Sequence, residues 1–175
     1  MTDILTPEQR SLLMARVQGR DTKPEWILRS ALHRLGFRFT LNNRKLIGKP
    51  DIVLPKYRAV IFIHGCFWHQ HKRCKKASIP EKNRIFWCDK LRGNAKRDKK
   101  NELILAKQGF NVIVVWECQL YNQTIETIER VVQSLLKNKK LLSTHREKID
   151  YMNSRSLLKL AEQKVNYRLN RNRMQ

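Results

Sequence analysis

The chain has 175 residues, 41% of them hydrophobic, and its 37 Lys and Arg against 15 Asp and Glu give a formal net charge of +22 at pH 7. A chain of this length can bury one core without disulfides, and so high a charge favours a polyanionic partner, either nucleic acid or an acidic membrane surface. The longest apolar runs, near Ala59–Ile63 and Val112–Trp116, are strand-sized, so neither a membrane-spanning helix nor a membrane partner is expected. The N-terminus lacks a secretory signal pattern, which predicts a protein of the cytoplasm, associated with the bacterial nucleoid, with reduced thiols.

The first part of the chain predicts helices. Leu5–Val17 carries a weak helical pattern. Asp21–Glu25 has the features of a helix start, namely an N-cap oxygen, an early proline and an acid in the first turn. Apolar residues then recur at helical spacing until Gly36 ends the predicted helix. The residues of this apolar pattern are Trp26, Ile27, Ala31, Leu32 and Leu35.

Three predicted strands follow this helix. They are Phe37–Leu41, Ile52–Leu54 and Arg58–Ile63. Pro55–Tyr57 is the turn between the last two, and if it closes a hairpin, Asp51 falls opposite the Phe62–His64 end of the neighbouring strand. The Asp51 carboxylate and the His64 ring are then neighbours.

The second half of the chain completes the layers of the fold. It predicts a helix at Asp98–Gln108, a buried strand at Val112–Trp116 and a helix at Gln123–Lys137. The first of these helices is expected to place Leu103, Ile104 and Ala106 inward. The order of elements predicts an α/β fold with a mixed central sheet flanked by helices. We expect one domain over residues 1–140 and a basic, partly helical extension over residues 141–175.

The stretch Ile61–Cys74 concentrates chemistry-bearing residues. It places three histidines, two cysteines and large aromatics directly after a run of β-forming residues, which core packing alone does not explain. A set with the Cys₃His composition of a closed structural Zn²⁺ site comprises Cys66, His71, Cys74 and Cys118. On spacing alone, ordinary buried thiols are an equal alternative. Asp51 offers a hard oxygen ligand suited to Mg²⁺, although an isolated Pro-Asp pair more often closes a turn.

The Asp51 pair is not isolated. Pro50-Asp51, followed by Phe62-Ile63-His64, resembles the PD-(D/E)xK nuclease motif, with Phe62 in the place of the second acid and His64 in the place of the lysine. The chain also contains G-C-F-W-H at 65–69, F-W at 86–87, N at 94 followed by R-D at 97–98, and V-W-E-C at 115–118. With these motifs, roughly residues 6–137 resemble the very-short-patch-repair (Vsr-type) DNA mismatch endonucleases.

The resemblance implies a restriction-endonuclease-like core and a catalytic site. It implies that Asp51 and the backbone carbonyl of Ile63 bind two catalytic Mg²⁺ ions, which stabilise the attacking and leaving oxygens of a phosphodiester displacement. His64 and His69 match the family's catalytic histidines. We expect His69 to transfer a proton and His64 to support the attacking water or the phosphate.

Two acids match further positions near the family's site. Glu25 and Asp98 are expected to orient metal-bound waters or histidines, with surface salt bridging as the alternative. The resemblance also favours one Zn²⁺ ion in the Cys₃His set over ordinary thiols, although the third ligand, Cys74, comes one residue later than in the family. Cys88 is expected to be a packing thiol.

The resemblance also implies how mismatched DNA is recognised. Phe67, Trp68 and Trp87 match aromatics that push between base pairs beside the mismatch, and Met14 matches a residue that enters from the opposite groove. Unstacking costs least where pairing is already imperfect, so such a wedge selects mismatches. Aromatics packed in the core are the alternative.

The function implied is Mg²⁺-dependent nicking of one strand of double-stranded DNA at a T·G mismatch, the lesion left when 5-methylcytosine deaminates. A monomer is expected, with DNA repair or methylation proteins as further candidate partners. Two alternatives remain open. One is a less selective nickase associated with restriction and modification, and the other is a zinc-stabilised nucleic-acid-binding protein without catalysis.

Overall fold

The computed structural model describes residues 6, 8, 9, 12, 19 and 21–137. The predicted helix at Leu5–Val17 lies mostly outside the described residues, and the predicted extension at 141–175 lies wholly outside them. The helices are α2 (Lys23–Arg34), α3 (Arg84–Lys107), α4 (Glu117–Asn122) and α5 (Thr124–Leu136). The strands are β1 (Thr40–Leu41), β2 (Ile52–Leu54), β3 (Ala59–His64) and β4 (Asn111–Trp116), and the short 3₁₀ turns are η1 (Pro55–Tyr57) and η2 (Lys75–Ala77).

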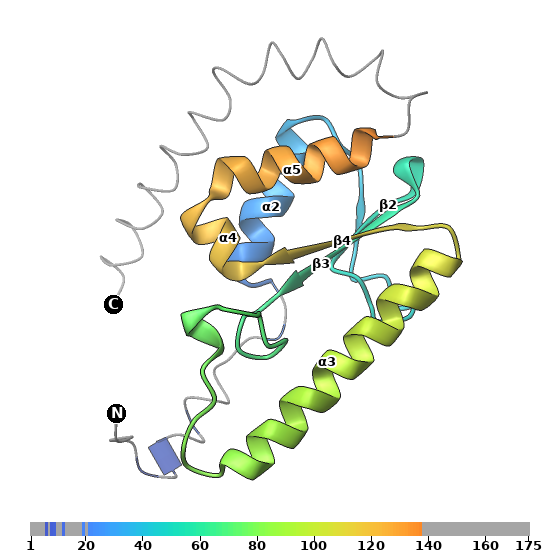
Figure 1. The fold of residues 1–175 in the computed structure, drawn as a ribbon. Coiled ribbons are helices and arrows are strands. Elements are labelled where there is room, and N and C mark those ends of the chain that lie inside the picture. Colours follow the sequence, from blue (N-terminus) through green and yellow to red (C-terminus); the bar gives the residue numbers. More distant parts are fainter. Residues whose placement is uncertain (1–5, 7, 10–11, 13–18, 20, 138–175) are drawn as a thin grey trace.

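The four strands form one mixed sheet in the order β1-β2-β3-β4. The pairs β1–β2 and β2–β3 are antiparallel, and β3–β4 is parallel. Helices α2, α4 and α5 cover one face of this sheet and α3 crosses the other (Figure 1). The predicted α/β fold with a mixed sheet flanked by helices is therefore confirmed.

The hairpin between β2 and β3 has the predicted turn. Ile52 pairs with Ile61 and Leu54 with Ala59, while η1 makes the connection. Arg58 takes the left-handed conformation at φ 46°, which completes the turn within a few residues. Because Asp51 directly precedes Ile52, this register sets it opposite the end of β3, as expected.

The sheet buries apolar side chains on both faces because helices cover both. One core lies between the sheet and α2, α4 and α5, and it includes Leu28, Leu32, Ile61, Val115 and Ile128. A smaller core on the other face joins Val53, Val60 and Phe62 to Leu105 of α3. Alternate residues of β2 and β3 thus serve different cores, which locks the register of the hairpin.

Helix α2 starts where the sequence predicts. Thr22 and Glu25 form a capping box, Pro24 stands in the first turn, and Gly36 at φ 82° follows the helix end. The exception to the predicted apolar face is Trp26, which is 52% exposed. The buried stripe runs through Ile27, Leu28, Ala31 and Leu32, and Trp26 lies beside that stripe rather than on it.

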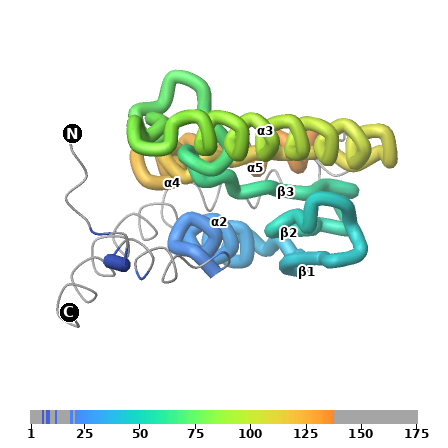
Figure 2. Tube along the Cα trace, turned by 90° about the horizontal axis from the view of Figure 1, so that it is seen from below, coloured from blue at the N-terminus to red at the C-terminus, as the bar shows by residue number. Residues whose placement is uncertain are grey.

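Helix α3 differs most from its prediction. It begins at Arg84 instead of Asp98, and it buries Leu105, whereas Leu103 and Ala106 are exposed and Ile104 is half-buried. The residues that recur on its inner side are Trp87, Leu91, Asn94, Asp98, Asn101 and Leu105. Because this stripe is partly polar, hydrophobic periodicity misses the first half of the helix. Figures 1 and 2 show that half running beyond the sheet, alongside the loop after β3.

Three smaller differences concern two strand boundaries and one short helix. The predicted strand Phe37–Leu41 shortens to Thr40–Leu41, because Phe37 turns into the core and packs against Tyr57 with ring centroids 5.2 Å apart. The strand predicted at Arg58–Ile63 is shifted by one residue, to Ala59–His64. The short helix α4 was not predicted, since it is only one or two turns long and follows β4 without a loop.

Candidate active site and metal centre

A cleft of about 620 Å³ opens at the carboxyl ends of the parallel strands β3 and β4. This is the edge at which open α/β sheets usually bind ligands. The start of α2, the loop before β2, the middle of α3 and the start of α4 complete its walls. Every residue predicted to act in catalysis lines this cleft, namely Glu25, Asp51, Ile63, His64, His69 and Asp98.

Asp51 is held at the end of β3 by the backbone. Its Oδ2 atom accepts a hydrogen bond from the Ile63 N–H at 2.7 Å. Burial raises the pKa of Asp51 to about 6, and the charge of Glu25 adds to this, whereas the Ile63 hydrogen bond, Arg29 and His69 oppose it. A bound divalent cation would offset the burial and restore the ionised carboxylate, so this donor fits a hard metal ion.

The two histidines expected in catalysis lie face to face. The rings of His64 and His69 are stacked with centroids 3.9 Å apart and planes at 5°. Burial, followed by the neighbouring His69, lowers the pKa of His64 to about 4, while Asp98 acts in the opposite direction. His64 is therefore neutral at neutral pH and can accept a hydrogen bond from water.

Asp98 fixes the orientation of His69. The Oδ2 atom of Asp98 lies 2.6 Å from Nδ1 of His69. Ligand atoms of His64, His69 and Asp98 lie within 4.8 Å of one another. Each ring nitrogen directs its lone pair in the ring plane, so two parallel rings cannot aim at one metal ion. The histidine pair is better suited to handling protons and water than to sharing a metal.

Glu25 is buried at the edge of the cleft, with 4% of its surface exposed. It accepts hydrogen bonds from the backbone N–H and the hydroxyl of Thr22. It also pairs with Arg29, whose guanidinium reaches Asp21 at 2.6 Å. From the sequence, a surface salt bridge is the alternative role of Glu25. Glu25 does form a salt bridge, but the pair lies at the wall of the cleft and not on an open surface.

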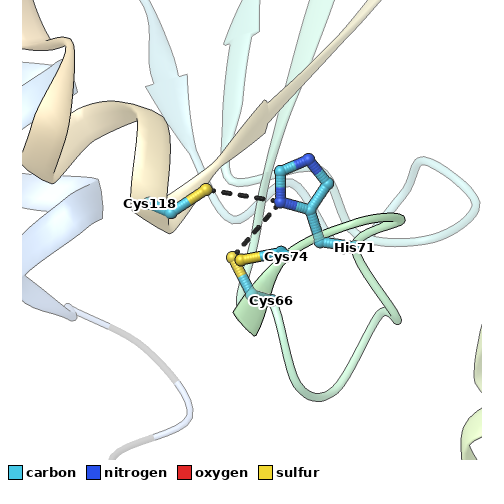
Figure 3. A group of neighbouring side chains, drawn as sticks. All are labelled: Cys66, His71, Cys74 and Cys118. Atoms are coloured by element: carbon cyan, nitrogen blue, oxygen red, sulfur yellow. Dashed lines mark hydrogen bonds between the residues drawn. The ribbon is translucent and has the colours of Figure 1, made fainter. Parts of the chain in front are cut away.

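The predicted Cys₃His set is assembled beside the cleft (Figure 3). The loop after β3 supplies Cys66, His71 and Cys74, and the first turn of α4 supplies Cys118. The Nδ1 atom of His71 lies 3.6 Å from Sγ of Cys66 and 3.3 Å from Sγ of Cys118.

The four residues fit a tetrahedral metal ion. All four ligand atoms lie within 4.8 Å of one another, and the 3.6 and 3.3 Å separations of His71 from the two sulfurs match the edge of about 3.5 Å of a tetrahedron around Zn²⁺. Burial raises the pKa of Cys66 to about 12 and also raises the pKa of Cys118. The backbone hydrogen bond of Lys76 lowers the pKa of Cys74, and a bound metal ion would displace the protons that remain on the other thiols. Cys88 lies outside this group and is half-buried on α3.

The three aromatics expected to contact DNA form one cluster. Phe67 packs edge-on against Trp68 at 5.1 Å and against Trp87 at 5.3 Å between ring centroids. The ammonium of Lys90 lies 5.8 Å from the Trp68 ring and 5.6 Å from the Trp87 ring. All three aromatics are half-buried, so they are neither core residues nor fully exposed. Met14 lies outside the described residues.

Some residues of the site were not predicted. Trp116 stands between the two centres, with its ring edge-on to His64 at 5.3 Å and stacked on His71 at 4.2 Å. The amide of Asn94 donates a hydrogen bond to the Trp68 carbonyl at 3.1 Å. Trp116 belongs to the V-W-E-C motif at 115–118, and Asn94 is the N of the motif that ends with R-D at 97–98. The sequence predicts no role for either residue. Other cleft residues without a predicted role are Lys23, Lys49, Asn101, Glu102, Glu117 and Tyr121.

Residues 2–76 match the family model described as DNA mismatch endonuclease Vsr. The chain is 37% identical over 135 residues to the DNA mismatch endonuclease Vsr of Escherichia coli (strain K12), covering 77% of this chain and 86% of that relative. The chain belongs to this family. It is also 49% identical over 137 residues to the type II nicking enzyme V.NmeAIP of Neisseria meningitidis serogroup A, covering 77% of this chain and 97% of that relative. The chain is 46% identical over 120 residues to the type II nicking enzyme V.XorIIP of Xanthomonas oryzae pv. oryzae. The match covers 69% of this chain and 88% of that relative.

Membership of the Vsr family makes this protein an endonuclease, a hydrolase that acts on DNA. DNA is thus the polyanion that the net charge of +22 indicates. A nuclease of this family implies a divalent metal, and the cleft supplies a carboxylate suited to one. Within the residues that the structure describes, no helix is both long enough and apolar enough to cross a bilayer.

Proposed function

We propose that this Vsr-family protein nicks one strand of duplex DNA at T·G mismatches and that the reaction depends on Mg²⁺. The observation that carries the proposal is the convergence of Asp51, His64 and His69 on one cleft. Asp51 and the carbonyl of Ile63 are the proposed Mg²⁺ ligands. Two bound Mg²⁺ ions would neutralise the phosphate charge and stabilise the attacking and leaving oxygens. A binding module would not need a carboxylate of raised pKa beside two imidazoles.

Side chains of the cleft are proposed to transfer the proton and to position the attacking water. Asp98 holds Nδ1 of His69, so Nε2 is the nitrogen of His69 available to exchange a proton with the reacting oxygens. His64 is neutral and supports the attacking water or the phosphate. Glu25, paired with Arg29, orients water at the wall of the cleft. In-line hydrolysis by this set leaves a 5′-phosphate and a 3′-hydroxyl that a polymerase can extend.

Zn²⁺ in the Cys₃His group is proposed to be structural. All four positions are filled by protein ligands, which leaves no open position for water. The group ties the loop that carries His69 to the junction of β4 and α4. The Trp116 ring lies against both His71 and His64, so the same group steadies the catalytic histidines.

Mismatch selection is assigned to the aromatic cluster of Phe67, Trp68 and Trp87, with Met14 acting from the opposite groove. Their half-buried rings are supported by one another, which suits side chains that must displace base pairs without moving themselves. Unstacking costs a few kcal/mol per step and least at a mispaired step, so the cluster favours a T·G site over paired DNA. We propose that the enzyme acts as a monomer in the cytosol.

A second candidate is a nickase of wider mismatch selectivity, linked to restriction and modification. It is favoured by the relatives described as type II nicking enzymes. The two candidates share the cleft and differ in the substrate that the aromatic cluster accepts.

One experiment separates them. The purified protein is incubated with labelled duplexes that are fully paired or that carry T·G, A·C or T·C, with and without Mg²⁺. A nick only in the T·G duplex, only in one strand and only with Mg²⁺ supports the proposal. Equal nicking of several mismatches supports the second candidate, and binding without a nick in any duplex contradicts both.

A further inference from the structure

Two lysines from distant segments meet at one aromatic ring. The Nζ atom of Lys76 lies 4.8 Å from the centroid of the Tyr121 ring, and the Nζ atom of Lys23 lies 5.9 Å from it. Lys23 is the first residue of α2, Lys76 belongs to η2, and Tyr121 lies on α4. None of these three residues belongs to the proposed catalytic residues or to the Cys₃His group.

The lysine pair stands beside the catalytic cleft. Lys23 and Tyr121 line the same cleft as Asp51 and His64. Lys76 is positioned by the metal centre, since η2 directly follows Cys74 and the Ala77 N–H donates to the Cys74 carbonyl at 3.0 Å. Folding of the loop that carries Cys66, His71 and Cys74 therefore brings Lys76 to Tyr121.

The charge of the cleft explains why cations are needed there. Its walls carry five carboxylates, from Glu25, Asp51, Asp98, Glu102 and Glu117. A DNA strand that enters brings one negative charge per phosphate, and these carboxylates repel it. Bound metal ions can compensate at the scissile phosphate, but the neighbouring phosphates need cations from the protein.

The Tyr121 ring prepares the lysines for this task. A lysine side chain loses considerable rotamer freedom when it is fixed on a ligand. A contact with a ring face restricts the side chain in advance, and an ammonium group carries three N–H donors, which suit phosphate oxygens. Preordering of this kind lowers the entropy lost on binding.

We propose that Lys23 and Lys76, ordered by Tyr121, bind a backbone phosphate of the nicked strand next to the scissile one. The ligand class is a DNA phosphodiester. This inference rests on the proposed function, because it takes the cleft to hold the strand that is cut.

The test is the salt dependence of DNA binding, measured without added Mg²⁺ so that no strand is cut. Each lost phosphate contact makes the slope of log K against log salt less negative by about 0.9. Because the two lysines share one phosphate, Lys23→Gln and Lys76→Gln are each expected to make the slope less negative by part of that amount, and the double variant by about 0.9 in total. The matched control is Lys56→Gln, since Lys56 lies 6.0 Å from the Tyr57 ring in η1, at the opposite end of β3. The control is expected to keep the wild-type slope.

A second measurement locates the contact. It uses a series of T·G duplexes, each with one neutral methylphosphonate at a different position of the nicked strand. At one position near the nick, the neutral linkage should weaken binding by the wild type. At that same position, it should not weaken binding by the Lys23 and Lys76 double variant. Tyr121→Leu should weaken binding, whereas Tyr121→Phe should not. Zinc content and thermal unfolding of each variant verify that the fold is intact.

Slopes of the Lys23 and Lys76 variants equal to that of the wild type would overturn the inference, as would an equal loss in Lys56→Gln. Nicking by the wild-type protein is assayed in parallel with the binding measurements. If the wild type binds DNA but never nicks a T·G duplex, the proposed function fails, while the slopes still decide whether the lysines contact phosphate.

Discussion

The carboxylate of Asp98 lies 2.6 Å from Nδ1 of His69, and the His69 ring lies flat on that of His64 with centroids 3.9 Å apart. One acid on α3 thus sets the orientation of the ring proposed to transfer the proton. Proton transfer by a positioned side chain contributes about 10²–10⁴-fold to a rate, and it depends on that orientation.

Asp98→Asn should therefore lower the nicking rate by about 10- to 100-fold, while affinity for T·G DNA stays within about twofold. The substitution keeps the size of the side chain but removes the charge that faces His69. Single-turnover nicking and binding titrations measure the two effects, and the pH profile of the rate should change shape. The control is Asp89→Asn, on an exposed turn of the same helix. A rate loss in both variants, or in neither, would argue against an orienting role for Asp98.

The pKa of Asp51 predicts a pH dependence that varies with the Mg²⁺ concentration. Burial raises this pKa to about 6, so below that pH the side chain is protonated and neutral and binds Mg²⁺ poorly. At limiting Mg²⁺, nicking should fall as the pH drops through about 6. At saturating Mg²⁺ the midpoint should move to lower pH, because the cation competes with the proton. Rate–pH profiles at two Mg²⁺ concentrations measure this shift, and identical midpoints would contradict Asp51 as a metal ligand.

Cys118→Ser should remove the proposed structural Zn²⁺. The variant loses one of four ligands, and we expect the bound zinc to fall from about one per chain to far below that, with a lower temperature of unfolding. Cys88→Ser is the matched control, since Cys88 is outside the Cys₃His group. It should keep both zinc and stability. Metal analysis with thermal unfolding measures the effects, and zinc retained in full by the Cys118 variant would exclude the assigned site.

Replacing Trp68 with Ala should reduce mismatch preference more than general DNA affinity. The Trp68 ring is half-buried in the aromatic cluster, and a wedge of the kind proposed acts only where bases are displaced. We expect the ratio of T·G to paired-DNA affinity to fall about tenfold or more, with a much smaller change on paired DNA. Competition binding measures this ratio. Trp26→Ala, at an exposed position on α2, is the control, and equal losses on both duplexes would reduce Trp68 to a packing role.

The position of Asp51 at the end of β3 could be predicted from the sequence because it depends on a short hairpin. Pro55–Tyr57 fixes the register of β2 and β3, and that register brings Asp51 to the end of β3, where it accepts the hydrogen bond of the Ile63 N–H. The Cys₃His group could be predicted as well, since three ligands lie in one loop and Cys118 follows the neighbouring strand.

Other features depend on packing that a sequence pattern does not reveal. The first half of α3 escaped prediction because its inner face carries Asn94, whose amide bonds to the Trp68 carbonyl instead of packing in an apolar core. The contact of Trp116 with both His64 and His71 arises from ring orientations at the end of β4. The meeting of Lys23 with Lys76 depends on the fold of the whole loop that carries Cys66, His71 and Cys74.

The central claim is that Asp51 serves metal-dependent strand cleavage in this cleft. The most direct test is Asp51→Ala, assayed for nicking of a T·G duplex at saturating Mg²⁺ and for binding of the same duplex. The claim predicts that nicking is abolished while the duplex is still bound with an affinity close to that of the wild type. Nicking retained at the wild-type rate would contradict it.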